Sequence, residues 1–118
     1  MATITPVITR VDSNGGRGFS VLWETVTEND TCTAVELGPH SDRSAQITGT
    51  FGSGNVSIEG SNDGTNYEIL DDLGGTAITL SAAGLQGVGP LTRYIRPRTP
   101  TGTSVDVDVT VFVMGGSK

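Results

Sequence analysis

The stretch from residue 104 to residue 114, SVDVDVTVFVM, alternates valine with other residues more regularly than any other part of the chain. Its five valines fall on one face of an extended strand, because successive side chains of a strand point to opposite faces. The other face begins with Asp106 and Asp108 and ends with Phe112 and Met114. Since that face starts polar and ends apolar, we expect its apolar end to be covered by another segment of this chain or by another chain.

A second alternating stretch runs from Arg43 to Leu70 and predicts a three-stranded antiparallel meander. Its expected inward residues are Ala45, Ile47, Gly49, Phe51, Val56, Ile58, Gly60, Tyr67 and Ile69. Turns at 52–54 and 61–64 join the strands, since Asn and Asp bond their own backbone and glycine tolerates positive φ. The loop 61–66 lacks the ligand spacing of an EF-hand, so a hairpin turn is favoured over a calcium site.

The length and composition favour one all-β domain. The chain has 118 residues, enough for a modest core without disulfides. It has 17 glycines, roughly twice average usage, which suits many short strands and turns. We predict a single antiparallel β-sandwich or jelly-roll-like domain of about eight short strands. Residues 1–18 form an N-terminal arm or edge strand with a glycine-rich connector, residues 19–114 form the sandwich, and residues 115–118 form a flexible tail.

Further strands are expected on both sides of the meander. Residues 19–26 form one strand, and Trp23 on it is interpreted as a core anchor rather than a platform for sugars. Cys32 to Leu37 form another, with the single cysteine as a buried thiol. Two more strands are expected at residues 76–80 and 91–98. The glycine-rich segment 81–90 between them is interpreted as a crossover loop between two sheets.

The N-terminal strand, residues 3–11, contains Pro6 and is therefore an edge strand or an arm. The connector 12–18 is either an ordinary loop or a hinge that lets this strand join a neighbouring subunit. We expect the segment to contact a neighbouring subunit or another surface rather than complete its own sheet. Ile4, Pro6 and Ile8 are its candidate interface residues.

The charge argues against nucleic acid as a partner, because 13 acidic residues against 7 basic ones give a net charge of −6, which repels phosphate. Arg93 and Arg98 are candidates to pair with carboxylates of a partner. The alternative is pairing within the chain, to Asp106 or Asp108. No apolar stretch approaches the ~20 residues of a membrane span. The first six residues show neither region of a Sec signal, so folding in a reducing cytoplasm is expected.

No arrangement of residues predicts catalysis. His40, Ser41 and Asp42 lie in one short loop and cannot adopt the geometry of a catalytic triad, so a surface turn is favoured. Asp71 and Asp72 are neighbours that point apart and suit a solvated turn. We therefore expect a protein that is not an enzyme, with no catalytic residues, no metal site and no cofactor.

Several of these segments carry a resemblance. The run Gly49-Thr50-Phe51-Gly52, the run from Val56 to Tyr67 with its SNDG turn, and Arg93-Tyr94-Ile95-Arg96-Pro97 resemble small β-sandwich virion proteins of tailed bacteriophages. That group includes capsid decoration, or cement, proteins. The likeness covers roughly residues 19–113, and its motifs are structural rather than catalytic.

The resemblance implies a structural virion protein that binds the capsid exterior and stabilises it by bridging capsomers. The implied partner is the major capsid protein, the implied assembly is a homotrimer, and neither nucleic acid nor membrane is a partner. Assembly would occur in the host cytoplasm. Phe112 and Met114 join the candidate interface residues named above. The alternative is a phage tail or fibre component, or a receptor- or carbohydrate-binding β-sandwich module.

Overall fold

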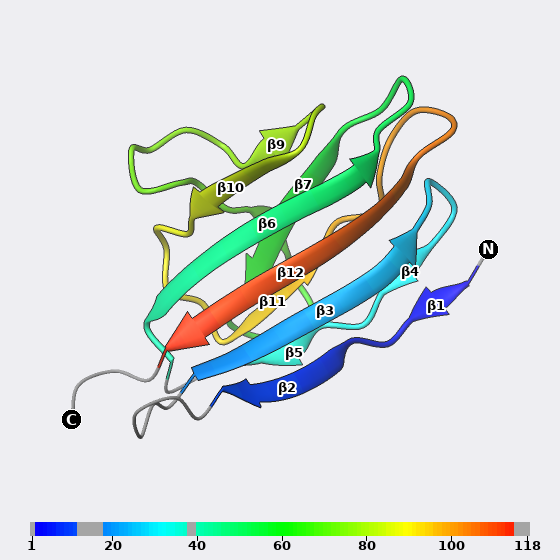
Figure 1. The fold of residues 1–118 in the computed structure, drawn as a ribbon. Helices are drawn as coiled ribbons and strands as arrows, with labels where there is room; N and C mark the ends of the chain where they lie inside the picture. The colour runs from blue at the N-terminus through cyan, green and yellow to red at the C-terminus, as the bar shows by residue number, and fades with distance from the viewer. Residues whose placement is uncertain (1, 12–17, 38–39, 115–118) are drawn as a thin grey trace.

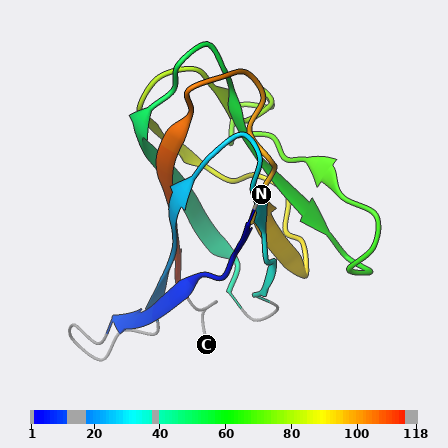
Figure 2. The same ribbon diagram turned by 90° about the vertical axis from the view of Figure 1, so that its right-hand side faces the viewer.

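The computed structural model describes residues 2–11, 18–37 and 40–114, and these form a two-layered β-sandwich (Figures 1 and 2). Within these ranges there are twelve strands and no helix. The strands are β1 (Thr3–Ile4), β2 (Val7–Val11), β3 (Gly18–Val26), β4 (Thr31–Cys32), β5 (Val35–Glu36), β6 (Asp42–Thr50), β7 (Val56–Ser61), β8 (Glu68–Ile69), β9 (Thr79–Leu80), β10 (Gly84–Gly87), β11 (Tyr94–Pro97) and β12 (Asp106–Met114). The predicted all-β sandwich is thus confirmed.

The front sheet has the strand order β10-β6-β12-β3-β2, and all of its pairs are antiparallel. β12 lies at its centre, between β6 and β3 (Figure 1). The alternation in its sequence is realised as predicted: the valines are buried in the core, whereas Asp106, Asp108, Phe112 and Met114 are exposed on the other face. Burial of these branched side chains against the second sheet is the main driving force for the sandwich.

A bulge interrupts the pairing of β3 with β12. The register shifts between Val107 and Val109, and Thr25 on β3 takes a positive φ of 54°. The carboxylate of Asp108 accepts a hydrogen bond of 2.9 Å from the backbone N–H of Thr25 and so holds the bulge. Because the bulge adds one residue, Trp23 and Val26 both point into the core.

The back sheet has the strand order β5-β11-β7-β8, with β9 also paired to β7. Ile58 of β7 and Ile95 of β11 are fully buried against the front sheet. All six residues of β7 are buried, including Ser57 and Glu59, which the alternation placed on a wet face. They do point outward, but Thr79 of β9 and Arg96 of β11 cover them.

The predicted meander is only partly correct. β7 and β8 form the expected hairpin, but β6 lies in the front sheet and β7 in the back sheet. The intervening turn therefore carries the chain from one layer to the other, and buried Phe51 closes the end of the core there. At the other end of the meander the inward residue is Leu70, and Tyr67 instead packs its ring on Arg96 on the outer side.

The segment from Cys32 to Leu37 is not one strand. β4 pairs in parallel with β1, whereas β5 pairs with β11 of the back sheet. The chain thus moves between edges within a few residues, because Cys32 and Leu37 both have to reach the core. The thiol of Cys32 is buried as predicted.

The N-terminal segment breaks at Pro6 into β1 and β2. β2 pairs with β3 along its whole length, so it is an edge strand of its own sheet. The expectation that residues 3–11 reach a neighbouring subunit instead of their own sheet is therefore wrong. The connector 12–17, Gly38-Pro39 and the tail 115–118 lie outside the described residues.

The segment 81–90 does cross between the layers, but it also contains a strand that the sequence did not predict. β10 pairs with β6 and forms the second edge of the front sheet, with Leu85 opposite Gln46. High glycine content concealed this strand, since glycine has low β propensity. The turn at 61–66 is the predicted hairpin turn, with the Asp63 carboxylate bonded to the backbone of Thr65 and Asn66.

Candidate interaction surface

The outer face of the front sheet is a broad surface made by side chains in register across its strands. One row, from edge to edge, consists of Val7, Leu22, Thr110, Gln46 and Leu85. The next row consists of Thr9, Ser20, Phe112 and Ser44. The face is therefore rich in hydroxyl and amide groups, with apolar side chains at defined places, and no described segment of the chain packs over it.

Phe112 and Met114 form the apolar end of this face. They are 36% and 37% exposed, and both rest on Gly18 of the neighbouring strand. A Cβ atom at Gly18 would lie 2.9 Å from Met114 Sδ and 3.0 Å from Phe112 Cζ, so a larger residue there would displace these two side chains. A shallow hollow of about 240 Å³ adjoins the two side chains, bordered by Asp42, Arg43 and Ser44. We call this pair and its hollow the Phe112–Met114 patch.

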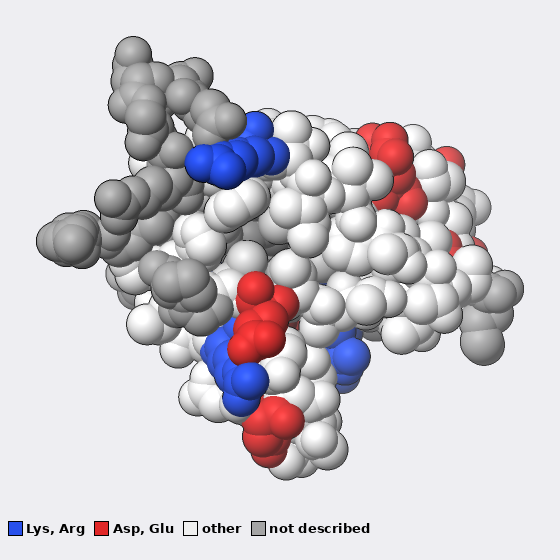
Figure 3. Space-filling model, turned by 90° about the horizontal axis from the view of Figure 1, so that it is seen from below, with Lys and Arg blue, Asp and Glu red and all other residues white. Residues whose placement is uncertain are grey.

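Ile8 lies at a different place. It is opposite Val21 and so faces inward, yet it is 54% exposed, because β2 projects beyond the second sheet (Figure 2). A hollow of about 330 Å³ opens beneath it, and we call this the lower groove. The lower groove is lined by Ile8, Phe19, Val21, Val35, Glu36, Leu37 and His40. Seen from below, an uncharged stretch of surface separates a basic patch from a mixed cluster of acidic and basic side chains (Figure 3).

The other two N-terminal candidates are less available. Ile4 is partly buried and packs against the core, and Pro6 is partly buried at the break between β1 and β2. His40 packs edge-on against Phe19, with ring centroids 5.1 Å apart. It is thus part of the lower groove's wall.

Arg93 pairs within the chain, but not with the residues expected. Its Nε donates to Glu36 Oε2 at 2.6 Å, and hydrogen bonding to Glu36 raises the pKa of the guanidinium. Asp106 and Asp108 lie on the front sheet, away from this pair. More than half of each side chain is exposed, so the Arg93–Glu36 pair adds little to stability. The Arg98 side chain is exposed and has no hydrogen bond or ion pair to any residue in the described ranges.

The seven candidate interface residues therefore do not form one surface. Phe112 and Met114 lie together on the front sheet, whereas Ile8 lines the lower groove. Arg93 pairs with Glu36, which also lines that groove, and Arg98 directly follows β11 of the back sheet. Exposed Val7 and Leu85, on the same face as Phe112, were not singled out from the sequence. Val7 could have been recognised from the sequence as an outward position of an edge strand. Leu85 could not, because it lies in the segment that was interpreted as a loop.

The described ranges contain no cluster of three residues suited to bind a metal ion and no helix that could cross a membrane. No protein-family model, no curated protein and no solved structure matches the chain.

Proposed function

We propose that this protein is a structural virion protein that decorates the exterior of a phage capsid and holds neighbouring capsomers together. The observation that carries the proposal is the Phe112–Met114 patch at one end of a broad, hydroxyl-rich sheet face. Solvent-exposed apolar side chains grouped on one face are typical of interaction sites. The flanking Ser and Thr hydroxyls suit the polar rim that surrounds such an apolar centre.

The proposed mechanism is adhesive rather than chemical. Phe112 and Met114 would bury their remaining apolar area against the major capsid protein, and the hydroxyl groups around them would hydrogen-bond to its surface. One such contact is weak, but simultaneous contacts to adjacent capsomers give a large gain through effective concentration. The shell is stabilised because separating two capsomers then requires breaking these contacts as well.

A homotrimer is part of the proposal, and the lower groove is the surface that supports it. Its apolar lining and the exposed Ile8 would be covered by an adjacent copy. Light scattering should give a mass three times the chain mass of 12.2 kDa. Ile8→Ser should shift the protein to monomers, whereas Val7→Ser, an equally exposed change on the opposite face of β2, should not. A wild-type monomer, alone and on the capsid, contradicts the trimer.

The capsid contact is tested with virions of the phage whose genome encodes this chain. Immunogold labelling and a cryo-EM map should place the protein on the head, and the purified protein should rebind to heads from which it has been removed. The double variant Phe112→Ser/Met114→Ser should bind at least tenfold more weakly. The control is Leu73→Ser, which removes an exposed leucine from a turn outside the patch. Absence from the head, or equal binding by the double variant, contradicts the proposal.

A further inference from the structure

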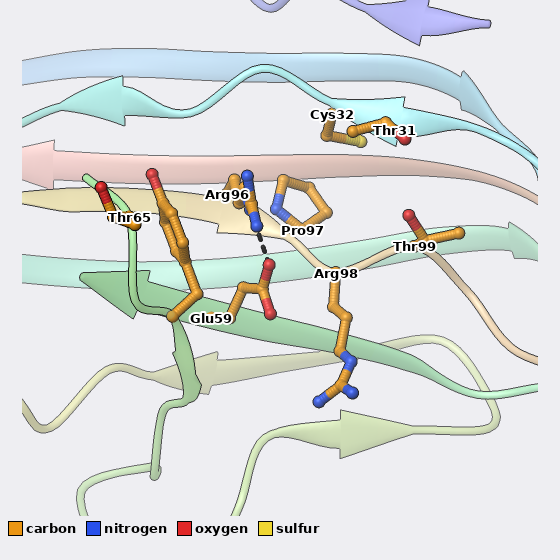
Figure 4. A pocket seen from close by; sticks show the side chains of 9 residues that line it. Thr31, Cys32, Glu59, Thr65, Arg96, Pro97, Arg98 and Thr99 are labelled. Carbon is orange, nitrogen blue, oxygen red and sulfur yellow. Dashed lines mark hydrogen bonds and ion pairs between the residues drawn. The ribbon is translucent and has the colours of Figure 1, made fainter.

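The outer side of the back sheet carries a polar hollow of about 400 Å³ that the decoration role does not use (Figure 4). Its floor is formed by Glu59 of β7 with Arg96 and Pro97 of β11. Thr65 lies on one side of the floor, and Thr31 and Thr99 lie toward the other (Figure 4). We call this the polar hollow.

Glu59 and Arg96 are held in a defined geometry. Arg96 Nε donates to Glu59 Oε2 at 2.6 Å, and the Glu59 side chain is only 9% exposed. The ring of Tyr67 stacks on the guanidinium, with its centroid 3.6 Å from Arg96 Cζ. A guanidinium fixed by a carboxylate on one side and a ring on its face loses little entropy when it binds a ligand.

The same guanidinium keeps binding capacity. Within the described residues, the two Nη groups of Arg96 have no hydrogen-bond partner, and the side chain, which lines the hollow, is 30% exposed. Paired Nη groups suit a planar carboxylate, which they bind in a bidentate manner. An ion pair in such a place contributes little to folding stability, because desolvation offsets its attraction. Folding stability therefore does not account for the Glu59–Arg96 pair, whereas binding of a ligand by the free Nη groups would.

The remaining lining indicates what else the ligand carries. The hydroxyls of Thr31, Thr65 and Thr99 border the hollow and can each donate and accept. Arg98 extends past Glu59 and supplies a second cation (Figure 4). The charged side chains of the lining are two guanidinium groups and one carboxylate, and a second carboxylate, that of Asp30, lies near Cys32. This combination fits an anion that also bears several hydroxyl groups.

We propose that the polar hollow binds a carboxylate-bearing sugar, with the carboxylate on the Nη groups of Arg96 and the sugar hydroxyls on the threonines. The inference does not depend on the decoration role, and it gives the back sheet a ligand of its own. Glu59 and Tyr67 act as positioning residues, since they hold the guanidinium.

The test is a titration of the ¹⁵N-labelled protein with glucuronate, followed by amide NMR shifts. Saturable shifts are expected at the amides of Thr31, Thr65 and Thr99. Arg96→Gln should weaken binding at least tenfold. Arg98→Gln should weaken it several-fold without breaking any hydrogen bond or ion pair within the described residues, because the Arg98 side chain makes none there. The matched control is Arg93→Gln, which removes the same charge from the same segment outside the hollow and should bind as the wild type does.

Three outcomes would overturn the inference. One is the absence of saturable shifts up to roughly 50 mM glucuronate, well above a millimolar Kd. Another is equal binding of glucose, which lacks the carboxylate. The third is equal binding of acetate, which would show that a carboxylate alone is recognised. If Arg96→Gln does not fold, as judged by far-UV circular dichroism, the glucuronate affinities of Arg98→Gln and Arg93→Gln are compared instead. Weaker binding by Arg98→Gln supports binding in the hollow, and equal binding by the two variants contradicts it.

Discussion

The indole Nε1 of Trp23 donates a hydrogen bond of 2.9 Å to the backbone carbonyl oxygen of Thr33. Trp23 lies on β3 of the front sheet, and Thr33 lies in the short segment between β4 and β5. The side chain is fully buried. A single residue therefore fills the core and also ties down the segment that connects the two layers.

Trp23→Ala should lower the free energy of unfolding by about 3–5 kcal/mol, because it leaves a large cavity. Trp23→Phe should cost less, since most of the apolar volume remains and the lost hydrogen bond is worth about 1 kcal/mol. Urea denaturation measures both. Val7→Ala, at an exposed position, should stay within about 0.5 kcal/mol of wild type. A stable Trp23→Ala protein, with water-exposed tryptophan emission in the wild type, would contradict the buried position.

Gly54→Ala should destabilise the protein by about 1–3 kcal/mol through overpacking. A Cβ atom at Gly54 would overlap the carbonyl oxygen of Thr101 and lie 2.8 Å from Val105 Cγ2, so two loops at the end of the sandwich would have to separate. Thermal or chemical unfolding measures the change. The matched control is Gly74→Ala, where the nearest contact of a Cβ atom beyond the adjoining residues would be Asp72 Oδ1, at an ordinary 3.4 Å. Equal stability of the two variants would show that the loops are not in close contact.

Cys32 should resist alkylation in the folded protein. Burial raises the pKa of its thiol to about 12, and the nearby carboxylate of Asp30 adds to the rise. The reactive thiolate is therefore almost absent at pH 8. Iodoacetamide labelling, followed by mass spectrometry, should be slow in buffer and fast in denaturing urea. Rapid labelling of the native protein would show that the thiol is accessible.

Asp63 should titrate below its ordinary pKa of 3.8, because the backbone N–H groups of Asn66 and Thr65 bond to its carboxylate. Since the folded-state pKa is lowered, the stabilisation is complete above the unfolded-state pKa and is lost as the pH falls through the folded-state pKa. The difference in unfolding free energy between wild type and Asp63→Asn should therefore shrink from pH 6 to pH 2. A ¹³C carboxyl titration gives the pKa directly, and a midpoint at or above 3.8 contradicts the prediction.

The parts of the fold that depend on local pattern were predictable from the sequence. Valine alternation fixed which face of β12 is buried, and the turn chemistry of Asn62, Asp63 and Gly64 fixed the hairpin between β7 and β8. Strand partners were not predictable in the same way. Nothing local distinguishes a turn that pairs β6 with β7 from one that carries the chain to the other layer, because the choice is decided by β12, which comes some fifty residues later.

The residues of the candidate surfaces were likewise predictable only where the pattern within a single strand determines them. Phe112 and Met114 were recognisable as apolar positions on a polar face. Glu59 was not recognisable as a floor residue of the polar hollow, because alternation placed it on a solvated face. Its burial comes from Arg96, which is 37 positions away in the sequence. The covering side chains belong to other strands, and periodicity within one strand contains no information about them.

The central place of β12 has a consequence for how the protein is made. β3 and β6 pair with it from either side, yet it follows every other described strand in the sequence. A ribosome has therefore synthesised the two flanking strands before their shared partner exists, and the nascent chain holds Trp23 and Ile47 without a completed core. The front sheet therefore lacks its central strand until β12 has been synthesised, and the unfinished chain leaves apolar side chains of β3 and β6 without their partner.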